Sequence, residues 1–149
     1  MKILFVCLGN ICRSPLAQAI AQKYNQDHEF DSAGISGYHR GSPPCKGSQW
    51  VAREHNIPIM HITSRPVRYP KDDHFDLILA LDTQNYQDLL AMGFEAHKVR
   101  KLGEFGFDGL DVPDPYYYTG MEGFERVYSM IETCVLNLIK EINDSSLGH

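Results

Sequence analysis

The sequence lacks any apolar run long enough to cross a membrane, which would need about 20 residues. Its 149 residues also contain no internal repeat, low-complexity segment or linker. A lysine precedes the first apolar run, but residues 3–8 are too few for a signal peptide and no small-residue cleavage site follows. We therefore predict a single globular domain over residues 1–149, located in the cytoplasm.

Basic residues are in the minority, because 14 lysines and arginines stand against 19 acidic residues and give a formal net charge of −5. An acidic chain is a poor partner for nucleic acid or for an anionic membrane, so we expect neither as a partner. The remaining composition, 43% hydrophobic and 22% charged, is that of an ordinary globular protein.

Cysteine is scarce, and the spacing of its four residues matches no zinc site: Cys7, Cys12, Cys45 and Cys134. We expect neither a metal nor a cofactor. A disulfide framework is not expected either in a cytoplasmic chain of this length. Cys7 and Cys12 are a special case because they share one short loop. Either Cys12 captures oxidised Cys7 or it packs beneath the loop, and the sequence leaves both open.

The most informative segment lies near the start of the chain, where an apolar run leads into a short loop and then a helix. Residues 3–6 are typical of a buried strand, and Cys7 follows them. Gly9 and Asn10 tolerate positive φ in a tight loop, and Pro15 suits the first turn of a helix. Such a loop can direct several backbone N–H groups, together with the helix N-terminus, at one bound anion.

Two side chains give this anion site its chemistry. A cysteine attacks as the thiolate, and the N–H groups, the helix N-terminus and Arg13 all favour the ionised form of Cys7. Arg13 offers a planar fork that matches two oxygens of a phosphoryl group, and Ser14 can donate a hydrogen bond to the sulfur. A cysteine that ends an apolar strand is usually a core residue, but core packing does not explain Arg-Ser-Pro six positions later. The loop therefore predicts phosphoryl transfer to a cysteine.

Residues 6–15, V-C-L-G-N-I-C-R-S-P, resemble the signature of the low-molecular-weight protein tyrosine phosphatases. The sequence D-P-Y-Y at residues 114–117 and the chain length extend the resemblance over essentially the whole chain. It implies an α/β fold of the phosphotyrosine protein phosphatase I type, with a single domain and a four-stranded parallel sheet that has helices on both faces. It also implies Cys7 as nucleophile, Arg13 as phosphate-binding residue and Asp114 as general acid, acting on a tyrosine-phosphorylated protein. We expect the protein to be a monomer.

Strand and helix patterns alternate along the chain, as βαβ units require. The strands are expected at residues 2–7, 30–33, 75–81 and 99–102, and the connecting stretch at 64–66 is expected to have some strand character. The helices are expected at residues 16–24, 44–55, 83–92 and 120–143. Asp82 is placed to cap the third helix, and Gly93 to end it.

Further candidate residues surround the predicted phosphate loop. The loop itself is expected to bind phosphate and substrate through Leu8, Gly9, Asn10, Ile11, Cys12 and Ser14. Loops at the ends of parallel strands carry function, so Tyr38 and His39 on the loop at 35–44 are candidates for the pocket entrance, although His39 can equally face solvent. The resemblance favours Tyr38.

Two residues are expected to support the loop, and two to form walls of the pocket. Ser32 and His61 are candidates for a polar network around the Asn10 amide, a role that the resemblance implies for His61. Tyr116 and Tyr117 would stack on a phenyl ring in a slot that favours phosphotyrosine over the shorter phosphoserine. Asp111, which also lies near the acid, is expected to be a solvated surface residue.

Two alternatives stay open, and a third is disfavoured. An arsenate reductase on the same scaffold would need a relay of further cysteines, but residues 78–82 contain none, and Cys45 and Cys134 are far apart in sequence. A non-catalytic phosphate-binding module would predict loss of the nucleophile or the acid, and both are present. A nucleotide-hydrolysing P-loop is disfavoured because no Gly-Lys-Ser/Thr follows the glycine.

Overall fold

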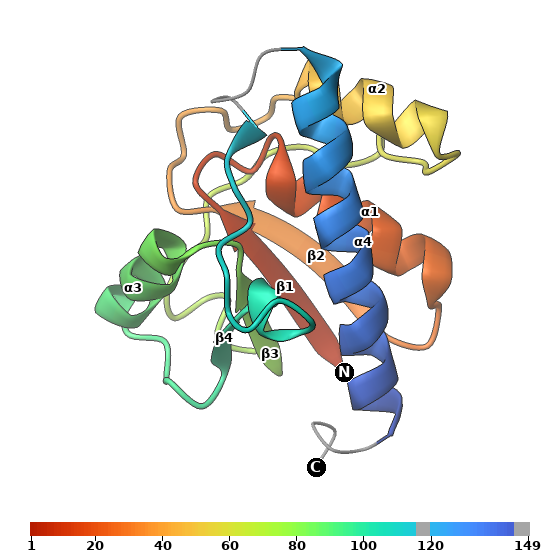
Figure 1. The fold of residues 1–149 in the computed structure, drawn as a ribbon. Coiled ribbons are helices and arrows are strands. Elements are labelled where there is room, and N and C mark those ends of the chain that lie inside the picture. Colours follow the sequence, from red (N-terminus) through yellow and green to blue (C-terminus); the bar gives the residue numbers. More distant parts are fainter. Residues whose placement is uncertain (116–119, 145–149) are drawn as a thin grey trace.

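The computed structural model describes residues 1–115 and 120–144. A four-stranded parallel sheet, in the order β2-β1-β3-β4, forms its centre (Figure 1). The elements in chain order are β1 (Lys2–Cys7), α1 (Arg13–Tyr24), β2 (Glu29–Gly34), α2 (Lys46–Glu54), β3 (Leu77–Ala80), α3 (Thr83–Met92), β4 (Val99–Lys101), the 3-10 helix η1 (Leu102–Glu104) and α4 (Met121–Asn143).

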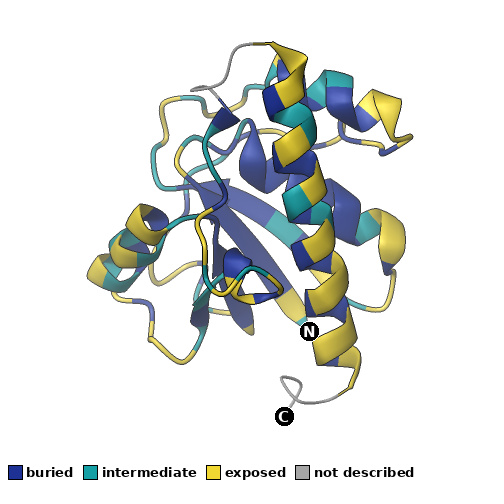
Figure 2. Cartoon of the chain, in the orientation of Figure 1, coloured by how far each residue is buried: buried dark blue, intermediate teal, exposed yellow. Residues whose placement is uncertain are grey.

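Helices cover both faces of the sheet, as predicted. Alternate residues of β1 point to opposite sides, because the side-chain period of a strand is two. Ile3 and Phe5 pack in a core with α1, α2 and α4, whereas Leu4 and Val6 pack in a second core with Leu89 of α3. The apolar run of β1 is therefore buried on both faces, as is typical of a central parallel strand (Figure 2).

The long last helix, α4, contributes an apolar stripe to the larger core. The buried members of this stripe recur at helical spacing and include Val127, Ile131, Val135, Leu138 and Ile142. Cys134 is buried beside this stripe, and burial raises the pKa of its thiol to about 12. It is therefore a small apolar core residue rather than a reactive group.

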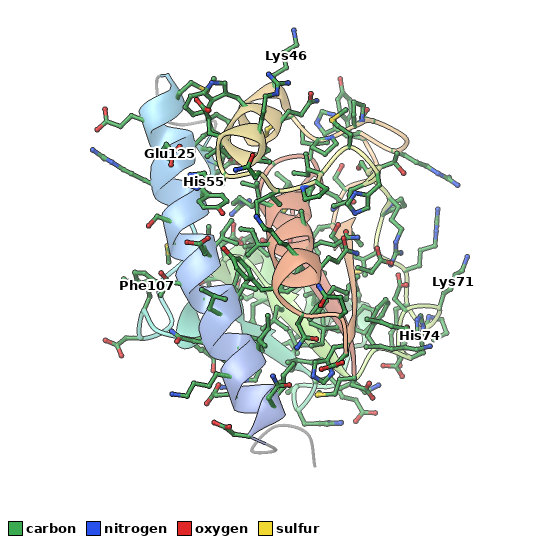
Figure 3. The ribbon with its side chains drawn as sticks, turned by 90° about the vertical axis from the view of Figure 1, so that its right-hand side faces the viewer. Lys46, His55, Lys71, His74, Phe107 and Glu125 are labelled. Carbon is green, nitrogen blue, oxygen red and sulfur yellow. A yellow bond between two sulfur atoms is a disulfide. The ribbon has the colours of Figure 1, made fainter. Side chains whose placement is uncertain are left out.

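An ion pair and a ring contact join α2 to α4 at the surface. His55 follows the last residue of α2, and its ring stacks on Tyr128 with the ring centroids 3.9 Å apart. The Nε2 atom of His55 lies 3.0 Å from a carboxylate oxygen of Glu125 (Figure 3). These contacts hold the start of α4, which follows the segment that bears Asp114, against α2.

The structure contains every predicted strand and helix, with ends that differ from the prediction by at most three residues. Asp82 caps α3 by accepting a hydrogen bond from the backbone N–H of Asn85, and Gly93 ends the helix in the left-handed region with φ 119°. The strand character predicted at 64–66 is confirmed by a single parallel bridge between Gly34 and Pro66. Residues 57–62 are irregular and bury isoleucines in the larger core, and Pro58 lacks the N–H that a ladder needs. No helix within the described ranges is long and apolar enough to span a membrane.

The chain passes from β1 to β2 on one side and later to β3 on the other side of β1. In open α/β sheets a ligand binds at such a reversal, outside the carboxyl ends of the strands. Cys7 ends β1, Gly34 ends β2 and Asp82 follows β3, so this edge of the sheet brings together residues that are far apart in sequence.

Gly34 generates a first prediction, because a Cβ built there would lie 2.9 Å from the Leu8 carbonyl oxygen and 3.0 Å from the Gly9 carbonyl carbon. Gly34→Ala would push the loop after β1, so we expect a loss of about 1–3 kcal/mol in the free energy of unfolding and a lower kcat/KM. Urea denaturation and phosphatase assays measure both effects. Gly37→Ala is the control, because its Cβ would meet Pro66 at an ordinary 3.6 Å and should change neither quantity.

Candidate active site

Cys7 lies at the base of a cavity of about 370 Å³ at the carboxyl edge of the sheet. Its side chain is buried, and its Sγ atom lies 3.0 Å from the Ser14 hydroxyl oxygen. Residues from three separate segments line the cavity: Cys7, Leu8, Gly9, Ile11, Cys12, Arg13, Ser36, Tyr38, His39 and Asp114. The three residues predicted as nucleophile, phosphate binder and acid therefore meet in one cavity.

The loop after β1 turns its carbonyl oxygens toward the surrounding protein. Those of Cys7 and Leu8 accept from the N–H groups of Ile35 and Ser36, and that of Ile11 accepts from Cys45 N–H. The remaining two are held by side chains: the Gly9 oxygen accepts from the Ser64 hydroxyl at 3.0 Å and the Cys12 oxygen from the Ser48 hydroxyl at 2.9 Å.

This outward pattern fixes the direction of the N–H groups. In a trans peptide the N–H of the next residue points opposite to the carbonyl. The carbonyls of residues 7, 8, 9, 11 and 12 face the surrounding protein, so the N–H groups of residues 8, 9, 10, 12 and 13 face the other way, toward the interior of the loop. Such a ring of N–H groups at the start of α1 is an anion-binding concavity.

Asn10 braces the loop from within. It is buried and adopts the left-handed conformation with φ 54°. Its Oδ1 accepts from the backbone N–H of Arg65 at 3.0 Å, and its Nδ2 donates to the Ser14 hydroxyl oxygen at 2.8 Å. The backbone donor settles which end of the amide carries the oxygen. Because Ser14 accepts from Asn10, its own proton is available for the Cys7 sulfur, to which it donates when that sulfur is a thiolate.

The other predicted support residues make different contacts. The Ser32 hydroxyl donates to Gln18 of α1 at 2.6 Å, so it packs beneath the sheet edge without bridging to Asn10. His61 is exposed, and its Nε2 lies 2.8 Å from the Gln22 side-chain oxygen. The role predicted for His61 is therefore wrong, and the backbone of Arg65 takes its place against Asn10.

Arg65 is itself fixed by two carboxylates. Its guanidinium pairs with Asp31 and Asp72, each at 3.1 Å. Burial alone would lower the pKa of Arg65, but the two carboxylates outweigh it and raise that pKa. The ion pairs hold in place the segment whose backbone N–H reaches Asn10. Sequence reasoning missed this contribution, and the Ser-Arg-Pro segment at 64–66 was its only signal.

Arg13 is almost fully buried, with 4% of its side chain exposed. One of its terminal nitrogens, Nη1, donates to an Asp82 carboxylate oxygen at 2.8 Å and to the Val112 carbonyl oxygen at 2.9 Å. The guanidinium is thus anchored from behind while it lines the cavity. The sequence analysis did not predict the ion pair between Arg13 and Asp82. The position of Asp82 directly after a parallel strand could have indicated it, because the carboxyl ends of such strands meet at one edge of the sheet.

The rim of the cavity is only partly described. Tyr38 is 87% exposed, and its ring makes an edge contact with His39 at 4.9 Å between centroids. Ser36 also lines the cavity and was not predicted. Asp114 lines it from the segment after η1, whereas Tyr116 and Tyr117 lie outside the described residues. In the ranges 1–115 and 120–144 no cluster of three His, Cys, Asp or Glu residues could hold a metal ion.

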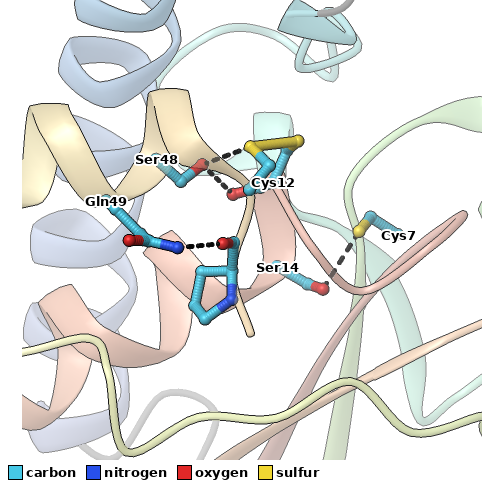
Figure 4. The surroundings of a disulfide bond; sticks show 7 residues. Cys7, Cys12, Ser14, Ser48 and Gln49 are labelled. Carbon is cyan, nitrogen blue, oxygen red and sulfur yellow. Dashed lines mark hydrogen bonds between the residues drawn. A yellow bond between two sulfur atoms is a disulfide. The ribbon is translucent and has the colours of Figure 1, made fainter. Parts of the chain in front are cut away.

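A disulfide joins Cys12, at the end of the loop, to Cys45, directly before α2 (Figure 4). The Cα atoms are 5.3 Å apart, and Cys7 is a free thiol. One expectation is corrected here, because the chain does contain a disulfide. The sequence left two roles open for Cys12, and neither of them included the pairing with Cys45 that the structure shows. The 33-residue separation hides this pairing in the sequence, because the path of the loop at 35–44 brings Cys45 back to the phosphate loop.

A parallel α/β sheet with a thiol, a buried guanidinium and a ring of N–H groups at its reversal point is the architecture of a cysteine-dependent phosphatase. The family model described as low molecular weight phosphotyrosine protein phosphatase matches residues 2–147. The chain belongs to this family and is a protein-tyrosine-phosphatase.

Individual relatives agree with this assignment. The low molecular weight protein-tyrosine-phosphatase YfkJ of Bacillus subtilis is 41% identical over 152 residues, covering 95% of this chain and 96% of the relative. A tyrosine phosphatase structure from Entamoeba histolytica, with Hepes in its active site, has a TM-score of 0.90 and 36% identity, covering 98% of this chain and 99% of that one. The structure of Wzb from Vibrio vulnificus in complex with benzylphosphonate has a TM-score of 0.87 and 30% identity, and the match covers 94% of this chain and 97% of that one.

The Asn10 brace generates a second prediction. Asn10→Ala should lower kcat/KM about tenfold or more, because the loop loses its link to Arg65 and Ser14 loses the donor that orients its hydroxyl. The protein should remain folded, as circular dichroism would show. Asn10→Gly separates the loss of the amide from the backbone strain that alanine adds at φ 54°, since glycine accepts positive φ without strain but also lacks the amide. Wild-type kinetics in both variants would contradict the bracing role.

The disulfide generates a third prediction. Reduction with dithiothreitol should lower the free energy of unfolding by about 2–4 kcal/mol, because the crosslink restricts the unfolded chain. Urea denaturation with and without reductant measures this change. Cys45→Ser is the control and should have the stability of the reduced wild type under both conditions. Equal sensitivity of Cys45→Ser and wild type to the reductant would contradict the assignment.

Proposed function

We propose that the chain hydrolyses phosphotyrosine in proteins through two successive displacements at phosphorus, with Cys7 as nucleophile, Arg13 as phosphate-binding residue and Asp114 as proton donor and acceptor. The observation that carries this proposal is the meeting of the three residues in one cavity above a ring of backbone N–H groups. Family membership supports the same chemistry.

In the first step the Cys7 thiolate attacks phosphorus. An S–P bond forms, the P–O bond to the tyrosyl oxygen breaks, and Asp114 delivers its proton to that oxygen. The N–H groups of the loop and Arg13 bind the three remaining phosphoryl oxygens, whose charge they balance throughout. Arg13 is suited to this because Asp82 and Val112 hold its fork in a fixed orientation.

In the second step water attacks the cysteinyl-phosphate. Asp114, now ionised, accepts a proton from the water, an O–P bond forms and the S–P bond breaks. The departing thiolate receives the hydrogen bond of Ser14, 3.0 Å away. Inorganic phosphate then leaves the loop. The same oxygens stay bound in both steps, so one set of donors serves two transition states.

The depth and lining of the cavity support an aryl phosphate as substrate. Cys7 is 3% exposed, whereas Leu8 and Tyr38 are exposed at the mouth. A phosphoryl group must pass these apolar side chains to reach the sulfur, and a phenyl ring provides the length and the stacking surface to do so. The benzylphosphonate in the Vibrio vulnificus Wzb structure has the same combination of ring and phosphoryl group.

The proposal extends to the setting of the enzyme. We take it to act in the cytoplasm, as a monomer, on a tyrosine-phosphorylated protein. A formal charge of −5 disfavours attraction to nucleic acid or anionic lipid, so we expect neither to compete with the phosphoprotein substrate.

The fourth prediction tests the assigned roles with p-nitrophenyl phosphate and phosphotyrosine peptides. Cys7→Ser should abolish turnover, and Asp114→Asn should lower kcat/KM for the peptide about 10²–10⁴-fold. Phosphate, vanadate and arsenate should compete with substrate. A chelator should leave the rate unchanged, because Arg13 and the N–H groups balance the charge. Substantial turnover by Cys7→Ser would exclude Cys7 as the nucleophile.

One feature of the structure favours the alternative function, arsenate reduction. A relay needs a cysteine pair near the nucleophile, and Cys12 with Cys45 forms one, although the two are distant in sequence. The assay that separates the two functions supplies arsenate and a dithiol reductant. Competitive inhibition without arsenite supports the phosphatase alone, whereas catalytic release of arsenite that depends on Cys45 supports the alternative.

A further inference from the structure

Asp111 lies three residues before Asp114 and is a surface residue, as expected from the sequence, but it makes contacts that the sequence did not predict. Its side chain is 47% exposed, yet one carboxylate oxygen, Oδ1, receives three donors. The Thr83 backbone N–H lies at 3.0 Å, the Thr83 hydroxyl at 2.8 Å and the Lys101 ammonium at 2.6 Å.

The side chains of Thr83, Lys101 and Asp111 form a closed ring of contacts that we call the clasp. The Lys101 ammonium also donates to the Thr83 hydroxyl oxygen at 2.8 Å, and that hydroxyl in turn donates to Asp111. Thr83 is the first residue of α3 and Lys101 the last residue of β4. The clasp therefore attaches the segment after η1 to a helix and a strand that are both part of the sheet's carboxyl edge.

Partial burial acts to raise the pKa of Asp111, but the hydrogen bonds and charge of Lys101 and the bonds from Thr83 outweigh it and lower that pKa. The carboxylate is therefore ionised at neutral pH, and its attraction to Lys101 is retained throughout the working range of the enzyme.

The residue after Asp111 connects the same segment to the phosphate-binding side of the cavity. Val112 is fully buried, and its N–H donates to the Leu81 carbonyl oxygen at 2.9 Å. Its own carbonyl oxygen accepts from Arg13 at 2.9 Å. Residues 111 and 112 thus contact β4, α3, the end of β3 and the catalytic guanidinium.

The path from Val112 to Asp114 is short and stiff. Pro113 and Pro115 flank Asp114, and a proline fixes its own φ and restricts the residue before it to extended backbone. A displacement of the anchored residues is therefore passed to the acid with little relaxation along the way.

We propose that Thr83, Lys101 and Asp111 are positioning residues for the reaction, and that their clasp holds the segment bearing Asp114 so that its carboxyl stays at the leaving oxygen while Arg13 binds the phosphoryl group. This inference rests on the proposed role of Asp114 as general acid. Asp82 and Thr83 are consecutive, so a single helix start sets the position of the guanidinium and of the acid relative to each other.

The fifth prediction tests the clasp by the leaving group of the substrate. A proton donor matters most when the leaving phenol is a strong base and little when it is a weak one. Asp111→Ala and Lys101→Met should lower kcat/KM about tenfold for phenyl phosphate and a phosphotyrosine peptide. The loss for p-nitrophenyl phosphate, whose phenol departs readily, should be about twofold or less.

Matched variants separate positioning from stability. Asp73→Ala removes a similar pair with Lys98, whose ammonium lies 3.3 Å from Asp73 Oδ1 at the opposite end of β4. It should show no dependence on the leaving group. Lys101→Arg should restore most of the loss seen in Lys101→Met. If Asp111→Ala fails to fold, Thr83→Val removes one donor of the clasp and leaves the Asp82 cap in place.

The outcomes distinguish a failure of the positioning role of the clasp from a failure of the acid role of Asp114. Equal losses on both substrates, or wild-type kinetics in Asp111→Ala and Lys101→Met, overturn the clasp if Asp114→Asn still shows the leaving-group dependence. If Asp114→Asn shows none, the acid assignment fails and the clasp fails with it. A dependence shared by Asp114→Asn and the clasp variants, absent from Asp73→Ala, supports the inference.

Discussion

The site depends on the outward direction of the carbonyl groups in the loop after β1. Each is held by a donor from a different part of the chain: the residues after β2, the serine at 64, or the start of α2. A planar peptide cannot turn its oxygen out without turning its N–H in, so these outer bonds create the inner donors. An acidic protein can therefore bind a dianion, because the local potential in the loop is set by dipoles and one arginine rather than by net charge.

The start of α3 is the second organising point. The capping residue is Asp82. One of its carboxylate oxygens accepts a hydrogen bond from the backbone N–H of Asn85 in the first turn of α3, and the other accepts from Arg13. The next residue, Thr83, binds the carboxylate of Asp111. With the roles proposed for Arg13 and Asp114, phosphate binding and proton transfer would both be positioned by one rigid element instead of by two independent loops. This arrangement keeps distances between reacting groups constant, which is the main requirement of phosphoryl transfer.

The sequence predicted what is local and missed what depends on strand order. Cys7, Arg13 and the tight turn at Asn10 belong to one continuous segment, so their spacing predicted the loop. Alternating strand and helix patterns predicted the βαβ units, and the family resemblance implied helices on both faces of the sheet. The contact between Arg13 and Asp82 spans 69 residues and exists only because β3 lies beside β1. His61 was misjudged for the same reason. Its place in the chain suggested the loop, but its side chain turns to Gln22 at the surface, and a backbone N–H meets Asn10 instead.

The disulfide changes how oxidation bears on the site. Cys12 has one sulfur, and in this structure Cys45 holds it, so Cys12 is not available to capture Cys7. Oxidation of the Cys12–Cys45 pair leaves the nucleophile a thiol and ties the loop to α2, next to the Cys12 carbonyl that Ser48 already holds. In the reduced protein the same sulfur is free to meet an oxidised Cys7. In this structure Cys12 therefore braces the loop through Cys45 and leaves Cys7 as a free thiol.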